Sequence, residues 1–347
     1  LSLDGPPELH DPYRVFPDGR PTAARVLDAL ARLRRHGVEF NVLCSVHRLN
    51  AARPREVYEF LREHGVKFMQ FIPIVVPAEG APGAATPESV TPELWGGFLC
   101  EIFDVWVRRD VGAVFVQAFD MTLAAWTGRV PPLCVMNETC GRALILEHNG
   151  DVYSCDHFAT PDHRLGNILQ RPLAEIVNSP RQAAFARDKR DRRPASCRAC
   201  RYDFACRGEC PKNRLAPPPG EDQPRSWLCS GYFRFFEHSA PFMGQMAEAP
   251  ARGLPAAVVM RQFGNGRLGA RPGRPRRRRP GAPRQVAPPA PVEPSHRDAA
   301  RRGCRLATCR GGRARTWCPP SCWPTRRRRC PRSPRRIWCG TSRICRR

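Results

Sequence analysis

The chain has 347 residues and a formal net charge of +25, with 57 Lys and Arg against 32 Asp and Glu. The excess lies entirely in residues 251–347, which hold 27 arginines and two acidic residues, whereas residues 1–250 carry 30 basic and 30 acidic residues. A global basic field that steers the first 250 residues to nucleic acid is therefore excluded. No apolar run approaches the roughly 18–20 residues that cross a bilayer, so we expect neither a transmembrane helix nor a membrane partner.

Helical and strand-like segments alternate through the first 110 residues. Apolar periodicity predicts, in order, a helix over 22–36, a strand over 38–46, a helix over 54–64, a strand over 66–76, a loop over 77–86 and a helix over 91–109. Gly37 and Gly65 are stop signals, and Thr91 with the following Pro-Glu is a start signal. The alternation predicts parallel βα units. Only about three such units fit, too few to close a barrel, so we expect the sheet to begin before residue 1.

Ten cysteines fall within residues 1–250. Cys44 and Cys100 stand alone in apolar segments and are expected to be buried small hydrophobic residues. The other eight lie within 134–229. A hairpin is predicted for 143–155, in the first part of this range, with its turn at Asn149-Gly150. After the last of them, Tyr232, Phe233, Phe235 and Phe236 predict a short aromatic helix-like segment.

The eight clustered cysteines have metal-ligand spacing. They are Cys134-x5-Cys140-x14-Cys155 and Cys197-x2-Cys200-x5-Cys206-x3-Cys210-x18-Cys229. Eight thiolates complete two four-ligand sites, and tetrahedral sulfur suits iron–sulfur clusters or zinc. Spacing alone leaves both open. Because no secretory leader is visible, disulfides are the least favoured interpretation of these cysteines. For the same reason we expect a cytoplasmic protein.

Residues 251–347 show no sustained periodicity and combine arginine, proline and seven cysteines without a paired C-x-x-C. Three interpretations stay open: a basic tail that binds RNA or DNA, a second cysteine–metal module, or an out-of-frame stretch that was never selected as protein. Disorder is expected in each case.

The segments GDVYSCD, LGNI, CRAC and CRGEC, set among the eight cysteines, resemble the twin-cluster SPASM domain of radical-SAM enzymes. Upstream, SLDGPPELHDPYR, EFNVLCSV and KFMQFIP resemble motifs of anaerobic sulfatase-maturating enzymes, so the resemblance covers roughly residues 1–238. It implies an α/β fold, with the C-terminal part of a partial (β/α)6 radical-SAM barrel over 1–125 and a small SPASM domain with two [4Fe-4S] clusters over 126–240. Composition adds a disordered Arg/Pro-rich tail over 241–347.

The resemblance also implies a reaction. A reduced [4Fe-4S] cluster cleaves S-adenosylmethionine, and the radical formed takes a Cβ hydrogen from a Cys or Ser of a sulfatase, which becomes Cα-formylglycine. One auxiliary cluster would use Cys134, Cys140, Cys155 and Cys210, and the other Cys197, Cys200, Cys206 and Cys229. The pairing of Cys210 with the first set cannot be derived from spacing.

Further residue roles follow from the same resemblance. Asp156 would be the proton acceptor, although alone it would be interpreted as a hairpin-end residue capping local backbone. Ser2, Arg14 and Val75 align with contacts to S-adenosylmethionine. Asp120, at the end of a predicted strand, is a rival carboxylate for the base.

The implied partners are a sulfatase polypeptide and an electron donor such as flavodoxin or ferredoxin, with nucleic acid not expected. The radical-SAM motif C-x3-C-x2-C is absent, since no cysteine precedes Cys44. We therefore expect an N-terminally truncated fragment that cannot cleave S-adenosylmethionine as given. Two alternatives remain: a SPASM-type maturase that modifies a ribosomal peptide, and a non-enzymatic zinc module with a basic nucleic-acid-binding tail.

Overall fold

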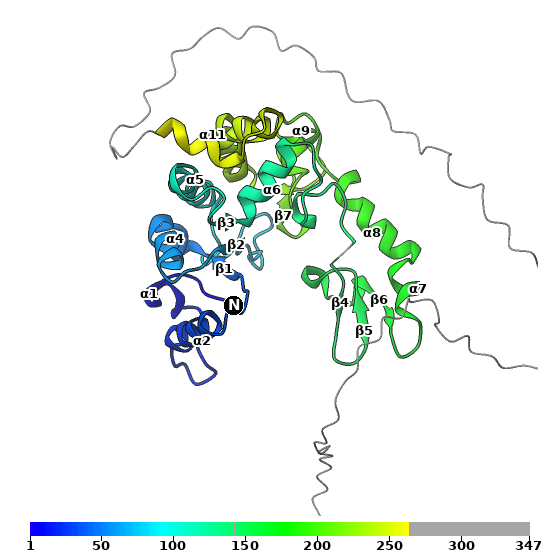
Figure 1. Cartoon of the computed structure of the whole chain (residues 1–347). Helices are drawn as coiled ribbons and strands as arrows, with labels where there is room; N and C mark the ends of the chain where they lie inside the picture. The colour runs from blue at the N-terminus through cyan, green and yellow to red at the C-terminus, as the bar shows by residue number, and fades with distance from the viewer. Residues whose placement is uncertain (142, 264–347) are drawn as a thin grey trace, which may run out of the picture. The chain divides into compact units, whose positions relative to one another are not determined.

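A parallel sheet and the helices beside it form the first half of the chain in this computed structural model, which describes residues 1–141 and 143–263. The elements are α1 (Pro7–His10), α2 (Ala23–Arg35), β1 (Val42–Val46), α3 (Arg48–Ala51), α4 (Pro54–Glu63), β2 (Phe68–Pro73), α5 (Pro92–Arg109), β3 (Phe115–Val116) and α6 (Gln117–Trp126). The strand order is β1-β2-β3, and both pairings are parallel. This confirms the parallel βα units, and Figure 1 shows α4 and α5 beside the sheet.

The ends of the predicted strands differ from those observed. β1 begins at Val42 and β2 spans Phe68–Pro73, so both are shorter than the apolar runs that predicted them. A segment before β1 also joins the sheet, because Ser2 forms a parallel bridge to Leu43. Cys44 and Cys100 are 0% and 6% exposed, which confirms that they are buried.

The cysteine-rich half consists of short elements followed by one long helix. They are η1 (Cys134–Met136), β4 (Ile145–Leu146), β5 (Asp151–Tyr153), η2 (Asp156–Phe158), η3 (Pro161–His163), β6 (Arg164–Asn167), α7 (Leu173–Val177), α8 (Pro180–Asp191), α9 (Ala195–Arg198), α10 (Asp203–Cys206), η4 (Pro211–Asn213), β7 (Arg214–Ala216), β8 (Arg225–Ser226), α11 (Cys229–Glu248), η5 (Ala249–Arg252) and η6 (Ala256–Phe263). The predicted hairpin is confirmed, with β4 antiparallel to β5 and β6 added as a third strand.

The aromatic segment belongs to α11, a 20-residue helix that runs past the boundary expected at residue 240. Phe235, Phe236, Met243 and Met246 are buried along it, so packing against the core extends the ordered structure beyond that boundary. The expected start of the tail was therefore wrong, because η6 continues to Phe263. The rest of the expected tail, 264–347, lies outside the described residues. In the described part, no helix is both long and apolar enough to cross a membrane.

Helices α5 and α11 approach each other at a pair of glycines. A Cβ on Gly96 would lie 2.9 Å from the Cα of Gly231, and a Cβ on Gly231 would press into the Pro92 carbonyl oxygen. Backbone cannot move aside as a flexible side chain can, so both positions require glycine. Trp227 adds a bond across the same region, donating from Nε1 to the Val90 carbonyl at 3.0 Å. The cysteine-rich half is thereby packed onto the sheet half.

Replacing Gly231 by alanine is expected to lower the free energy of unfolding by about 1–3 kcal/mol, because the new methyl group overpacks the α5–α11 contact. Gly244→Ala is the matched control, since Gly244 lies in the same helix with nothing within 4 Å of an added Cβ. That control is expected to be neutral or stabilising by up to about 1 kcal/mol. Urea unfolding of both variants measures the difference, and equal midpoints would contradict the close contact.

Candidate functional site

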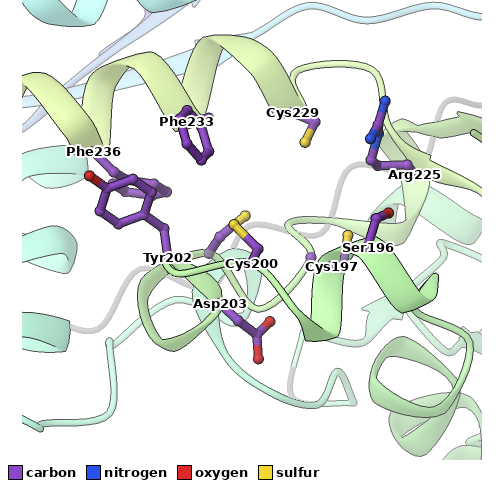
Figure 2. A pocket seen from close by; sticks show the side chains of 11 residues that line it. Ser196, Cys197, Cys200, Tyr202, Asp203, Arg225, Cys229, Phe233 and Phe236 are labelled. Atoms are coloured by element: carbon purple, nitrogen blue, oxygen red, sulfur yellow. The ribbon is translucent and has the colours of Figure 1, made fainter. Parts of the chain in front are cut away.

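The eight clustered cysteines lie in two groups around two separate cavities. Cys197, Cys200, Cys206 and Cys229, the second cysteine group, line a cavity of about 260 Å³. Helices α9, α10 and α11 contribute to this group. Figure 2 shows the sulfur atoms of Cys197, Cys200 and Cys229 directed toward the same space, with Phe233 and Arg225 at its edge.

Cys134, Cys140, Cys155 and Cys210, the first cysteine group, line another cavity of about 450 Å³. This cavity also borders the sheet, because Leu43 of β1 and Gln70 of β2 are among its lining residues. The structure therefore brings together the same two sets of four that the resemblance implies. Cys210 falls with the first group although only three residues separate it from Cys206 of the second.

Each group is a set of free thiols, since none of the ten cysteines in the described residues forms a disulfide. Burial raises the pKa of Cys197 to about 11 and that of Cys210 to about 12, and nearby carboxylates and thiolates add to the rise. Thiolates at these positions need a compensating positive charge, which a bound metal centre supplies.

Four thiols line each cavity, a donor set that suits either a zinc ion or a [4Fe-4S] cluster, since both are held by four thiolates. Burial raises the pKa of Cys206 and Cys210, and the backbone amides of Gly208 and Lys212 oppose that rise.

A left-handed turn connects the two groups. Arg207, Gly208 and Glu209 have φ values of 49°, 74° and 54°, a conformation that costs a non-glycine residue about 1–2 kcal/mol. Glu209 is 1% exposed and accepts hydrogen bonds from Asn213 Nδ2 at 2.9 Å and Ser226 Oγ at 2.8 Å. These bonds hold the turn, which directs Cys206 to one cavity and Cys210 to the other.

Two basic residues near the cysteines, the buried Lys189 and the half-buried Arg214, were not predicted from the sequence. Lys189 is 1% exposed, and its Nζ donates to the carbonyls of Cys134 and Val135 at 2.5 and 2.9 Å. Arg214 also donates to backbone carbonyls instead of a carboxylate. In the sequence, Lys189 and Arg214 are visible only as two of many basic residues among the cysteines. That position does not show which basic side chains pack against the cysteine groups.

Asp156 is exposed and lines the cavity of the first cysteine group. Its Oδ1 accepts hydrogen bonds from Cys155 Sγ at 3.1 Å and from the His157 amide at 3.0 Å. The contact with Cys155 needs a thiol proton. A metal-bound thiolate has no such proton, so this carboxylate oxygen is then available to another donor.

Asp120 does not share that cavity. It lies in the first turn of α6 and not at a strand end, because β3 stops at Val116. It lines a different cavity of about 420 Å³. Gln70 and Gln117 line both cavities, so the two adjoin. Burial raises the pKa of Asp120 from 3.8 to about 6.

The raised pKa of Asp120 makes stability depend on pH. Between pH 4 and 6 the folded state retains a proton that the unfolded state has lost, so stability falls across that range and stays lower above it. Asp120→Asn is expected to flatten this slope and to stabilise the protein at pH 7.5 by up to about 3 kcal/mol. Denaturant unfolding from pH 4 to 8 measures the effect, with exposed Asp28→Asn as control. A parallel profile for Asp120→Asn and wild type would contradict it.

Ser2 and Arg14 line one cavity of about 600 Å³, whereas Val75 is fully buried and not among its lining residues. Arg14 pairs with Asp4 through Nε at 2.5 Å, and Nη2 donates to Asp4 at 3.1 Å and to Ser45 Oγ at 2.8 Å. Nη1 makes no hydrogen bond within the described residues. Arg14 thus lines the cavity with a guanidinium that Asp4 fixes and that stays 31% exposed.

Comparison with known proteins identifies the family of the chain. Residues 134–201 match the family model for SPASM, an iron–sulfur cluster-binding domain. The chain is 42% identical over 281 residues to the serine-type anaerobic sulfatase-maturating enzyme of Bacteroides thetaiotaomicron, covering 77% of this chain and 68% of that relative. It is 34% identical over 239 residues to the serine-type enzyme of Klebsiella aerogenes, covering 68% of this chain and 56% of that relative.

A solved structure shares the fold. It is described as native anSMEcpe with bound AdoMet and Kp18Cys peptide, is 29% identical, and superposes with a TM-score of 0.65 over 72% of this chain and 68% of that one. A cysteine-type relative from Clostridium perfringens is 29% identical over 243 residues, covering 70% of this chain and 65% of that relative. On the strength of these matches and the SPASM domain, the chain belongs to the family of anaerobic sulfatase-maturating enzymes of the radical-SAM class.

Proposed function

We propose that this protein takes part in oxidising a Cys or Ser of a sulfatase polypeptide to Cα-formylglycine. The first cysteine group and Asp156 would lie beside the substrate residue that reacts. The observation that carries the proposal is the 450 Å³ cavity, where four cysteines and an exposed carboxylate border the sheet. When bound, S-adenosylmethionine and its [4Fe-4S] cluster supply the radical that removes the Cβ hydrogen. The remaining steps fall to this chain's own residues.

Asp156 is the proposed base. Loss of the hydrogen leaves a substrate whose thiol or hydroxyl must give up a proton as an electron departs. Asp156 follows Cys155 directly, so the proton acceptor would lie beside the cluster of the first cysteine group, which would accept the electron. Asp120 is the weaker candidate, because it lines the neighbouring cavity and not the one that the first cysteine group lines.

The proposed cofactors are two auxiliary [4Fe-4S] clusters and S-adenosylmethionine. The first and second cysteine groups would each hold one cluster, in a SPASM domain over 126–240 that follows the partial barrel over 1–125. Ser2, Arg14 and Val75 are the proposed contacts to S-adenosylmethionine. The fixed guanidinium of Arg14, with Nη1 available, suits its carboxylate. Val75 would contribute through packing, since it is buried.

The proposed partners are a sulfatase polypeptide and a small electron-transfer protein such as flavodoxin or ferredoxin. The relatives' names favour this function over the other two that the sequence leaves open, a ribosomal-peptide maturase and a zinc module. Both serine- and cysteine-type names occur among the relatives, and the two serine-type ones described above have the higher identities. We therefore infer that a serine-containing peptide is a substrate.

Mass spectrometry of a peptide substrate tests the proposal. The protein is assayed anaerobically with dithionite, S-adenosylmethionine and peptides of the form C-x-(A/P)-x-R or its serine counterpart. It is used both as given and joined to a segment that carries C-x3-C-x2-C. Formylglycine in the serine peptide, made by the joined form, is the expected product. A joined form that holds its clusters and releases 5′-deoxyadenosine but modifies neither peptide would oppose the assignment.

A further inference from the structure

Arg214 is the first residue of β7 and follows Cys210 of the first cysteine group by four positions. Its guanidinium donates from Nη2 to the Lys189 carbonyl at 2.9 Å, from Nε to Gly208 at 3.2 Å and from Nη1 to Arg192 at 3.4 Å. All three acceptors are backbone carbonyls. A guanidinium stays charged at any pH that a protein tolerates, so this positive charge is permanent.

The acceptors of Arg214 belong to segments that carry cluster ligands. Gly208 is the middle residue of the left-handed turn between Cys206 and Cys210, one cysteine from each group. Lys189 belongs to α8, and its side chain holds the Cys134 carbonyl. A single fork-shaped side chain therefore ties the turn to the helix that supports the first group, which fixes ligands of both groups relative to each other.

The charge of Arg214 lies close to both groups. The Gly208 carbonyl accepts from its Nε at 3.2 Å, and Gly208 is two residues from Cys206 of the second group and two from Cys210 of the first. Arg225 differs, because it lines the cavity of the second group and not that of the first. The chain thus offers one arginine beside ligands of both groups and another beside one group.

We propose that Arg214 is a positioning residue shared by the two auxiliary sites, which holds their ligands in register and raises the reduction potential of both clusters. The inference rests on the proposed assignment of a cluster to each cysteine group. A cluster bound by four thiolates is anionic, and one-electron reduction makes it more so. A nearby fixed positive charge stabilises the reduced form, and net charge and hydrogen bonding set such potentials.

The test is an anaerobic redox titration of the full chain, followed by electron paramagnetic resonance, on wild type, Arg214→Gln and Arg225→Gln. Arg214→Gln is expected to shift both auxiliary midpoints to lower potential, by about a tenfold change in the reduced-to-oxidised ratio, or about 59 mV for one electron. Arg225→Gln is expected to shift only the second. Arg214→Lys keeps a charge without the fork, so both midpoints should return toward wild type while both spectra stay altered.

Two results would overturn the inference: unchanged midpoints in Arg214→Gln, or a shift of one midpoint only. If Arg214→Gln fails to retain iron, Arg214→Lys decides, because spectra and midpoints identical to wild type would then contradict the positioning role. Failure of the proposed function is distinguishable from these outcomes. It would appear in the wild type itself, as protein without iron–sulfur clusters.

Discussion

Replacing Asp156 by asparagine is expected to lower the rate of formylglycine formation by about 10²- to 10⁴-fold, the range typical of losing a general base. Asparagine has nearly the same shape, and its amide oxygen can still accept the hydrogen bond that the His157 amide donates to Asp156. The local turn should therefore persist. It cannot take the substrate proton. The rate is measured by mass spectrometry of the peptide under saturating S-adenosylmethionine, in the form of the protein that carries C-x3-C-x2-C.

Asp162→Asn is the matched control for this experiment, because Asp162 is an exposed aspartate in the nearby turn η3 and does not line the cavity. Its rate should equal that of the wild type. Both variants should bind as much iron as the wild type, which separates loss of a base from loss of a cluster. Full activity of Asp156→Asn, with a large loss in Asp120→Asn instead, would transfer the role of base to Asp120.

Paired cysteine substitutions are expected to remove the two clusters independently. Cys134→Ala with Cys155→Ala should cost about four of about eight irons, and Cys197→Ala with Cys200→Ala should cost the other four, since two remaining thiolates cannot hold a four-iron cluster. Combining Cys134→Ala with Cys200→Ala damages both groups, so both cluster signals should be affected. Iron content and absorbance near 400 nm measure the losses.

Cys100→Ala is the control, because Cys100 is buried in α5 and lines neither cavity. It should retain all the iron of the wild type. Two results would contradict the grouping. One is equal loss of both cluster signals when two cysteines of one group are replaced, and the other is loss of only one cluster signal when one cysteine of each group is replaced.

The sequence predicted helices well where their apolar faces were regular. Positions 22–36 and 54–64 enclose α2 and α4, which the structure ends within one residue of those limits. It predicted α11 poorly. Pro241 interrupts the pattern inside that helix, and tertiary packing of Met243 and Met246 carries it onward. The prediction that Asp120 ends a strand was wrong for a related reason. β3 has only two residues, too few to show the alternation of apolar and polar side chains that predicts a strand.

The cysteines were visible in the sequence, but their surroundings were not. Lys189 bonds to Cys134, 55 positions away, and no local pattern reports a contact of that kind. The grouping of Cys210 apart from Cys206 depends on a left-handed turn that includes Arg207 and Glu209, two residue types that rarely adopt it. Spacing alone would place neighbouring cysteines on one centre, and resemblance to a known family was needed to separate them.

Metal and sulfide analysis of the full chain, prepared and reconstituted without oxygen, tests the central claim most directly. The account predicts a brown protein with about eight irons and about eight acid-labile sulfides per chain, and no stoichiometric zinc. A colourless protein with two zinc ions and no sulfide would contradict it, and the cavities lined by the two cysteine groups would then be structural zinc sites.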